Sequence, residues 1–238
     1  FVVKGALTTQ VEDESTKKLS ETGIGGRGTD KILLIPVKGV ITGQSSKKLF
    51  QETPSIVDSV KQQLKQARDD NAIKAVILKI NSPGGGITAS DIIYKKVLEF
   101  KEQTNKKVIV CMQDVAASGA YYISAAADKI ISHPTTITGS IGVIMPLINI
   151  ANLAEKYGIQ DNSIKSGDMK SIGSPLKKMS DAERKVLYDI VDEMYTRFIN
   201  IIAAGRNMEL EDVRKLSDGR IYTGVQALEN GLVDQLGY

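Results

Sequence analysis

The 238-residue sequence contains one histidine, one cysteine and no tryptophan. A disulfide within the chain is therefore impossible, and the position of Cys111 inside an apolar run predicts a buried structural thiol. One histidine and one cysteine cannot form a zinc centre, so we expect no metal site. The phosphate-loop and G-x-G-x-x-G patterns of nucleotide binding are also missing, and we expect no cofactor.

Aromatic residues make up 5% of the chain, and its net charge is only +3 at pH 7. Basic residues are dispersed and not interleaved with aromatic ones, so we expect no nucleic-acid partner. Every apolar run is shorter than the roughly 18 residues that a membrane-spanning helix needs. Because the chain begins with Phe1 instead of methionine, we expect it to have lost an N-terminal anchor or signal.

The remaining composition, 42% hydrophobic and 25% charged residues, is typical of a globular protein. Residues 1–30 are mostly polar and are predicted to be an N-terminal arm that follows the missing membrane anchor. Residues 31–238 show no internal repeat or second boundary and are predicted to form a single domain.

Short apolar runs predict buried strands at residues 32–37, 40–41, 73–80, 107–112 and 129–132. Helices are predicted between them, at residues 54–67, 88–100 and 119–127. Such alternation is typical of an α/β protein with a covered sheet. Thr53 followed by Pro54 predicts the start of the first helix, and Thr88 with Asp91 predicts a capping box for the second.

The last third of the chain is mostly helical. Ser180 and Glu183 predict a capping box at the start of a long amphipathic helix, and Gly205 is expected to end it. Its apolar stripe is long enough to pack on the sheet or on another subunit.

Ser118 lies between a predicted strand and a helix of small residues, with alanine before it and glycine after it. A serine on such a turn is accessible for nucleophilic attack and has the free N–H groups of the helix beside it. An ordinary helix N-cap is the alternative interpretation. The glycine-rich segment at residues 81–86 likewise predicts either half of an oxyanion hole, completed by the N–H of Gly119, or a plain loop.

A nucleophilic serine needs a base. His133 follows a strand directly and precedes a proline, a position typical of a structural histidine. Lysine serves as a base when an apolar site lowers its pKa. Lys170 and Lys165 are the candidates, in a loop of small and apolar residues, and composition alone does not separate them.

Four ordered motifs carry a resemblance to a known family. They are Asn-Ser-Pro-Gly-Gly-Gly at 81–86, Ala-Ala-Ser-Gly-Ala-Tyr-Tyr at 116–122, Thr-Gly-Ser-Ile-Gly-Val at 138–143 and Gly-Asp-Met-Lys-Ser-Ile-Gly-Ser-Pro at 167–175. Together they resemble signal peptide peptidase A, a family of serine–lysine peptidases, in its short single-copy Bacillus-type form. The resemblance covers residues 31–238 and implies a ClpP/crotonase-like α/β fold with repeated ββα units and a helical C-terminal portion.

The resemblance also implies a role for each matching residue. Ser118 matches the nucleophile, Lys170 the general base and Ser140 the serine that orients the base. The backbone N–H groups of Gly85 and Gly119 match the oxyanion hole. A hydroxyl is a suitable partner for a neutral lysine, because it accepts or donates a hydrogen bond without adding charge.

The substrates implied are cleaved signal peptides and similar apolar peptides, and we expect Ile87, Val115 and Ile144 to line their pockets. The family implies a homo-oligomer, an octamer whose dyads are shared between neighbouring subunits. It also implies an N-terminal anchor in the bacterial cell membrane, with the catalytic domain on the extracytoplasmic side.

Two other functions fit the same fold. A crotonase-like acyl-CoA enzyme would use glycine N–H groups without a nucleophilic serine, and would usually have an acidic base near the site. A non-catalytic membrane scaffold would have lost its catalytic residues, whereas Ser118, Ser140 and Lys170 are all present.

Overall fold

The computed structural model describes residues 22–25, 28–48 and 51–238, with the backbone alone for residues 46–48 and 51–53. Most of the predicted arm, residues 1–30, therefore lies outside the described residues. Its separation from a domain at residues 31–238 stays a prediction.

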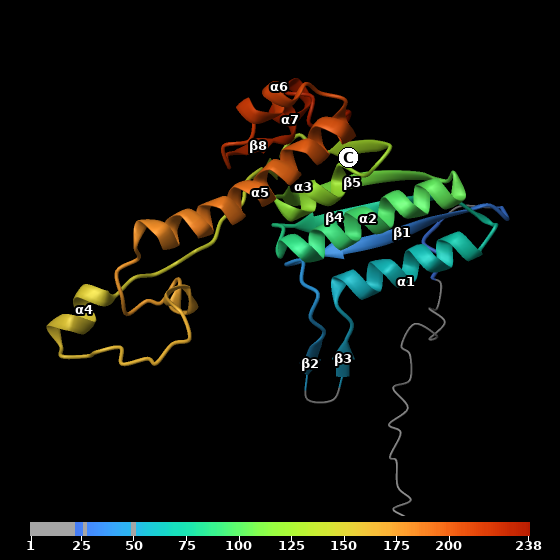
Figure 1. The fold of residues 1–238 in the computed structure, drawn as a ribbon. Coiled ribbons are helices and arrows are strands. Elements are labelled where there is room, and N and C mark those ends of the chain that lie inside the picture. The colour runs from blue at the N-terminus through green and yellow to red at the C-terminus, as the bar shows by residue number, and fades with distance from the viewer. Residues whose placement is uncertain (1–21, 26–27, 49–50) are drawn as a thin grey trace, which may run out of the picture.

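A mostly parallel sheet forms the centre of the molecule (Figure 1). Within the described residues its parallel strands run in the order β1 (Lys31–Lys38), β4 (Ile73–Ser82), β5 (Lys107–Ala117), β6 (Lys129–Ser132) and β9 (Gln235–Leu236). β7 (Ile137–Gly139) pairs in parallel with the end of β5, and β8 (Ile221–Thr223) is antiparallel to β7. A separate hairpin consists of β2 (Ser46–Lys48) and β3 (Gln51–Thr53). The predicted α/β class is confirmed.

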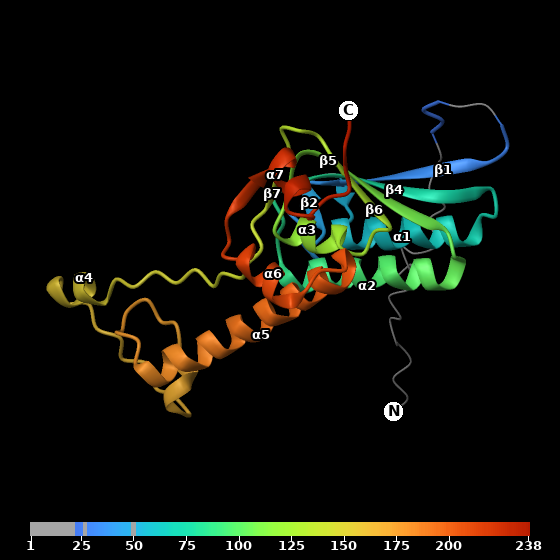
Figure 2. The ribbon, with the colours of Figure 1, turned by 90° about the horizontal axis from the view of Figure 1, so that it is seen from above.

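Three helices lie on one face of this sheet: α1 (Ile56–Asp69), α2 (Ile87–Thr104) and α3 (Gly119–Ser124) (Figure 2). Burial alternates along the strands, since Val76, Leu78 and Ile80 of β4 are fully buried. Residues of the other face, such as Ile77 and Ile109, are only half-buried. The helices therefore cover one side of the sheet, and the core lies between them and the strands.

Two predicted helix starts are wrong. α1 has Ser55 as its N-cap, whose side chain accepts a hydrogen bond from the N–H of Asp58, while Thr53 belongs to β3. α2 begins after Gly86, and Thr88 lies inside its first turn. The cause is tertiary: the N–H of Gly86 donates to the carbonyl of Ile41 at 2.9 Å, which places the turn before Thr88.

The strands before the site are longer than predicted. β5 continues to Ala117, and Ser118 follows it directly. The predicted helix at residues 119–127 is shorter, because α3 ends at Ser124.

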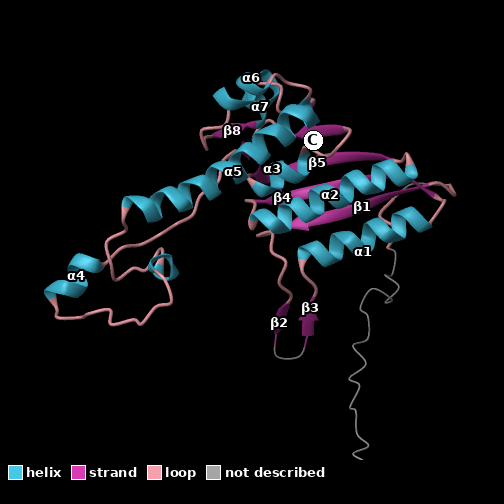
Figure 3. Ribbon diagram, in the orientation of Figure 1, coloured by secondary structure: helices cyan, strands magenta, loops and turns pink. Residues whose placement is uncertain are grey.

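Residues 142–193 extend away from the sheet and are named here the projection (Figure 3). They include α4 (Ala151–Lys156), a short 3-10 helix (Asp168–Ser171) and the first half of α5 (Asp181–Arg206). The second half of α5 packs, with α6 (Leu210–Lys215) and α7 (Gly224–Glu229), on the part of the molecule that contains the sheet. Large apolar side chains on the projection are exposed, among them Ile144, Ile148, Leu153, Tyr157, Ile159 and Ile164.

The capping box at the start of α5 is confirmed. The N–H of Ser180 donates to Glu183, and the N–H of Glu183 donates to the Ser180 hydroxyl. The predicted end at Gly205 is wrong, because α5 continues to Arg206. Gly205 serves close packing instead, since a β-carbon there would come within 2.1 Å of the Ala125 carbonyl oxygen.

We expect Glu183 to make the folding stability depend on pH in the acid range. Hydrogen bonds from Lys177 and from the Ser180 N–H lower the pKa of Glu183 from 4.5 to about 2. Because the pKa is lower in the folded state, the carboxylate stabilises the fold above about pH 4.5, and this contribution disappears as the pH falls towards 2.

Thermal unfolding of the Glu183→Gln variant and the wild type should differ at pH 7 and converge near pH 2. Asp192→Asn, which removes an exposed carboxylate from the same helix, is the control and should show no such convergence. A constant difference between wild type and Glu183→Gln across this range would contradict the assignment.

Candidate active site

Ser118 has a strained backbone conformation. It follows the carboxyl end of β5 with φ 53° and ψ −122°, a region that residues with a β-carbon rarely adopt. Its side chain makes no cap hydrogen bond to α3 and is half-buried. Ser118 therefore occupies the N-cap position of α3, as the alternative interpretation predicted, but its hydroxyl does not cap the helix. Strain of this kind persists only where the surrounding structure enforces it.

Ser140 lies next to Ser118 because two strands end together. Ala117 of β5 pairs with Gly139 of β7, and the Ser118 N–H donates to the Gly139 carbonyl at 2.8 Å. Ser140 also has a positive φ, 49°, and its N–H donates to the carbonyl of Arg220 at 2.8 Å. The structure thus brings together two predicted site serines, both on strained backbone.

The glycine-rich loop packs directly on the Ser118 turn. A β-carbon on Gly119 would lie 3.2 Å from the Gly85 nitrogen and 2.3 Å from the Ser90 hydroxyl. A β-carbon on Gly84 would lie 2.7 Å from the Gly119 nitrogen. Only glycine fits at these positions, so the backbone of the Gly84–Gly85 loop lies close to the backbone of Ser118 and Gly119.

The direction of the Gly85 N–H follows from the pairing of its neighbours. In a parallel bridge, the Ile41 N–H donates to the Gly84 carbonyl at 2.8 Å and the Ile41 carbonyl accepts from the Gly86 N–H at 2.9 Å. The N–H of Gly85 itself therefore points away from Ile41. Sequence reasoning missed Gly84, whose φ of 100° and tight contact with the Ser118 turn make a side chain impossible there.

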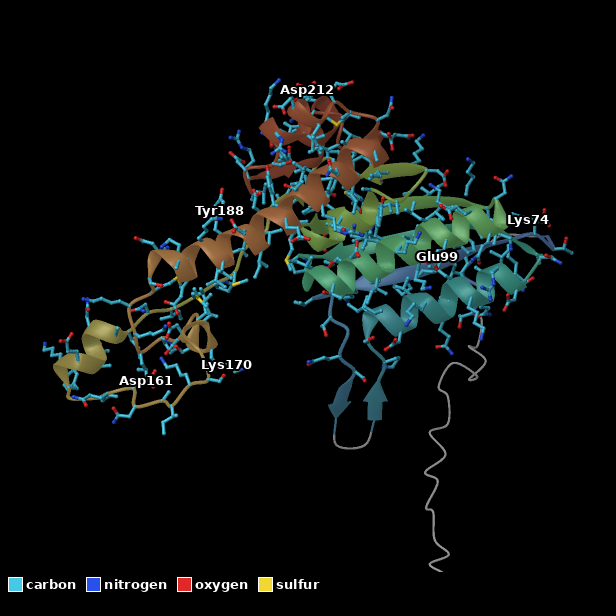
Figure 4. All side chains as sticks on the ribbon, viewed as in Figure 1. Lys74, Glu99, Asp161, Lys170, Tyr188 and Asp212 are labelled. Carbon is cyan, nitrogen blue, oxygen red and sulfur yellow. The ribbon has the colours of Figure 1, made fainter. Side chains whose placement is uncertain are left out.

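Lys170 lies apart from this cluster. It is exposed on the 3-10 helix of the projection, far from α3 (Figure 4). Lys165 lies in the same part of the projection, and its Nζ donates to the Ser171 hydroxyl at 2.9 Å. Within one chain, the structure therefore does not bring either candidate base to Ser118.

Two of the predicted pocket residues are near the glycines and the serine along the chain. Ile87 begins α2 directly after Gly86, and Val115 lies in β5 three residues before Ser118. Ile144 lies on the projection and is 82% exposed. Their contact with a substrate stays a prediction.

The two residues predicted to be structural are His133 and Cys111. The His133 ring packs edge to face on Tyr238, with ring centroids 5.4 Å apart. Cys111 is half-buried rather than buried, and burial raises the pKa of its thiol. In the described part of the chain, no group of three or more histidine, cysteine, aspartate or glutamate side chains is placed to hold a metal ion.

A serine whose hydroxyl does not cap the helix, on a strained turn packed against a glycine loop, is the arrangement expected of a serine hydrolase. Comparison with known proteins agrees with this class. Residues 100–238 match Peptidase family S49. The chain belongs to this peptidase family.

Three relatives illustrate the similarity. A protein of Enterococcus faecium named "Putative signal peptide peptidase SppA" is 43% identical over 224 residues, which are 94% of this chain and 65% of that protein. "Protease 4" of Haemophilus influenzae is 36% identical over 87% of this chain and 33% of its own length. "Serine protease SPPA, chloroplastic" of Arabidopsis thaliana is 31% identical over 88% of this chain and 31% of its own length. The chain thus spans less than two thirds of the length of these relatives.

Proposed function

We propose that the chain is the catalytic part of a serine endopeptidase in which Ser118 is the nucleophile and Lys170 the general base. The observation that carries the proposal is the strained Ser118 turn, held against the N–H groups of Gly85 and Gly119. Membership of a peptidase family and relatives named as proteases support the same activity.

The proposed reaction has two stages. Neutral Lys170 takes the hydroxyl proton of Ser118, and the serine oxygen attacks a peptide carbonyl. The N–H groups of Gly85 and Gly119 stabilise the negative charge that develops on the carbonyl oxygen. Protonated Lys170 then gives its proton to the leaving amine, and water hydrolyses the acyl-enzyme.

The base in this proposal comes from a neighbouring copy of the chain. Lys170 is on the projection, apart from its own Ser118, and the apolar side chains of the projection are exposed in one chain. Docking of the projection on a second copy would cover these side chains and bring Lys170 to that copy's Ser118. In this proposal Ser140, whose backbone lies beside that of Ser118, accepts a hydrogen bond from the incoming amine. The predicted octamer is one assembly of this kind.

The proposed substrates are cleaved signal peptides and similar apolar peptides. The name of the Enterococcus relative supports this class, as do the apolar residues Ile87 and Val115 beside the site. We also propose that the protein acts at the bacterial membrane with its catalytic part outside the cytoplasm. Among the residues that the structure describes, no helix has the length and apolar character to cross a membrane.

The test compares three possible activities of the purified chain. We expect hydrolysis of a synthetic signal peptide, covalent labelling of Ser118 by a fluorophosphonate, and no turnover of an acyl-CoA thioester. Turnover of the thioester without labelling would favour a crotonase-like enzyme. Neither labelling nor turnover by the assembled protein would favour a scaffold, and either result would overturn the proposal.

A further inference from the structure

We propose that Asp91 is a positioning residue that holds the helix after the oxyanion loop against the nucleophile helix and α5, through Tyr122 and Arg197. This inference rests on the proposed function, because it concerns the same nucleophile and oxyanion donors. It assigns no contact with the substrate to Asp91.

Three side chains from three helices meet at one carboxylate oxygen. The Tyr122 hydroxyl donates to Oδ1 of Asp91 at 2.6 Å. Arg197 donates to the same oxygen from Nε at 3.1 Å and from Nη2 at 2.7 Å. Tyr122 is buried, whereas the side chains of Asp91 and Arg197 are 31% and 58% exposed. The hydrogen bond from the buried Tyr122 hydroxyl to the charged carboxylate is therefore the stronger contact, because solvent screens the ion pair with Arg197.

Each of the three helices is directly connected along the chain to a segment of the proposed site. Tyr122 lies one helical turn after Ser118, and its N–H donates to the Ser118 carbonyl at 2.9 Å. Asp91 lies in the first turns of α2, which begins directly after the loop containing Gly85. Arg197 lies on α5, whose first half belongs to the projection. One carboxylate therefore joins the nucleophile helix, the helix that follows the oxyanion loop, and α5, which continues into the projection.

Aromatic packing surrounds this junction. The ring of Tyr122 lies edge to face with Tyr94, with centroids 5.4 Å apart, and 4.9 Å from the ring of Phe198 on α5. Burial, followed by the hydrogen bond to Asp91, raises the pKa of Tyr122, so the hydroxyl stays protonated as a donor. Tyr122→Phe keeps the ring contacts and removes one oxygen atom, which makes it the cleanest probe of the hydrogen bond.

Loss of this junction should affect the chemical step more than substrate binding. The N–H groups of Gly85 and Gly119 must meet an oxygen whose charge develops in the transition state, and small displacements of such groups cost about 10- to 100-fold in rate. We therefore expect Tyr122→Phe and Asp91→Asn to lower kcat by about 10-fold or more, with KM nearly unchanged.

The control is a second pairing of an aspartate with an arginine of α5. Arg206 donates from Nη1 to Asp234 at 3.0 Å, nine residues further along α5 than Arg197. Asp234→Asn makes the same chemical change as Asp91→Asn, and we expect it to lower the melting temperature without changing kcat. Active sites are counted by fluorophosphonate labelling, so that kcat refers to folded enzyme.

The outcomes separate the inference from the proposed function. Reduced kcat in Tyr122→Phe and Asp91→Asn, with unchanged kcat in Asp234→Asn, would support the inference. If both variants label and turn over like the wild type, Asp91 has a purely structural role and the inference is wrong. If the wild type is not labelled at Ser118, the proposed function fails, and the inference fails with it.

Discussion

Replacing Ser118 with alanine should reduce peptide hydrolysis to background, a loss on the order of 10⁴-fold or more in kcat. The reason is chemical: without the hydroxyl no acyl-enzyme can form, while the proposed oxyanion donors Gly85 and Gly119 are unchanged. The measurement is cleavage of a synthetic signal peptide, with fluorophosphonate labelling as the second readout. We expect both signals to disappear together.

A serine of the same helix provides the control. Ser124 is buried in α3, and its hydroxyl donates to the Ala120 carbonyl at 2.8 Å, so Ser124→Ala should stay active. Ser118→Gly adds a test of strain. Ser118→Gly should be as inactive as Ser118→Ala. Its free energy of unfolding should be higher than that of Ser118→Ala by about 1 kcal/mol, because glycine adopts positive φ without strain. Full cleavage by Ser118→Ala would remove Ser118 from the site.

Mixing two inactive variants should restore activity. Lys170→Ala lacks the proposed base and Ser118→Ala lacks the nucleophile, so each alone should be inactive. When they are co-expressed, a subunit with an intact Ser118 can lie beside one with an intact Lys170. If subunits mix at random, about a quarter of the sites are complete, and activity should recover to about that fraction of the wild type.

This experiment requires proof that the variants share one assembly. Different affinity tags on the two chains, with sequential purification, provide it. Lys165→Ala is the matched control and should be active alone, since Lys165 is the other lysine of the same segment. Mixed assemblies without activity would show that Lys170 does not act across the interface. Activity of Lys170→Ala alone would show that it is not the base.

The sequence predicted those parts of the fold that local patterns determine. Apolar runs located β1, β4, β5 and β6, and the reciprocal pairing of Ser180 with Glu183 located the start of α5. The strand predicted at residues 40–41 was wrong, since Ile41 makes only an isolated bridge to Gly85. Thr53 was wrong as a cap because it pairs with Ser46 in the β2–β3 hairpin, and Thr88 was wrong because pairing with a distant segment decides where α2 begins. The bridge between Ile41 and Gly85 places the turn into α2 one residue before Ile87, and no local pattern contains that pairing.

The candidate site was predictable in its residues more than in its geometry. The small residues around Ser118 indicate a strand-to-helix turn, but its φ of 53° results from the fit of the turn against the Gly84–Gly85 loop. Ser140 reaches Ser118 only through the register of β7 on β5. Asp91 fits a helix-capping pattern in the sequence, whereas its carboxylate binds residues 31 and 106 positions away.

If Lys170 is the base for Ser118, their separation within one chain means that catalysis requires contact between two chains. Under the proposed mechanism, an isolated subunit is latent because its two reacting groups lie apart, and latency requires no inhibitor. Dilution should lower the specific activity of the enzyme, and a high local concentration at a surface should raise it. Under this mechanism, the contact between subunits that buries the exposed apolar side chains of the projection would also complete the active site.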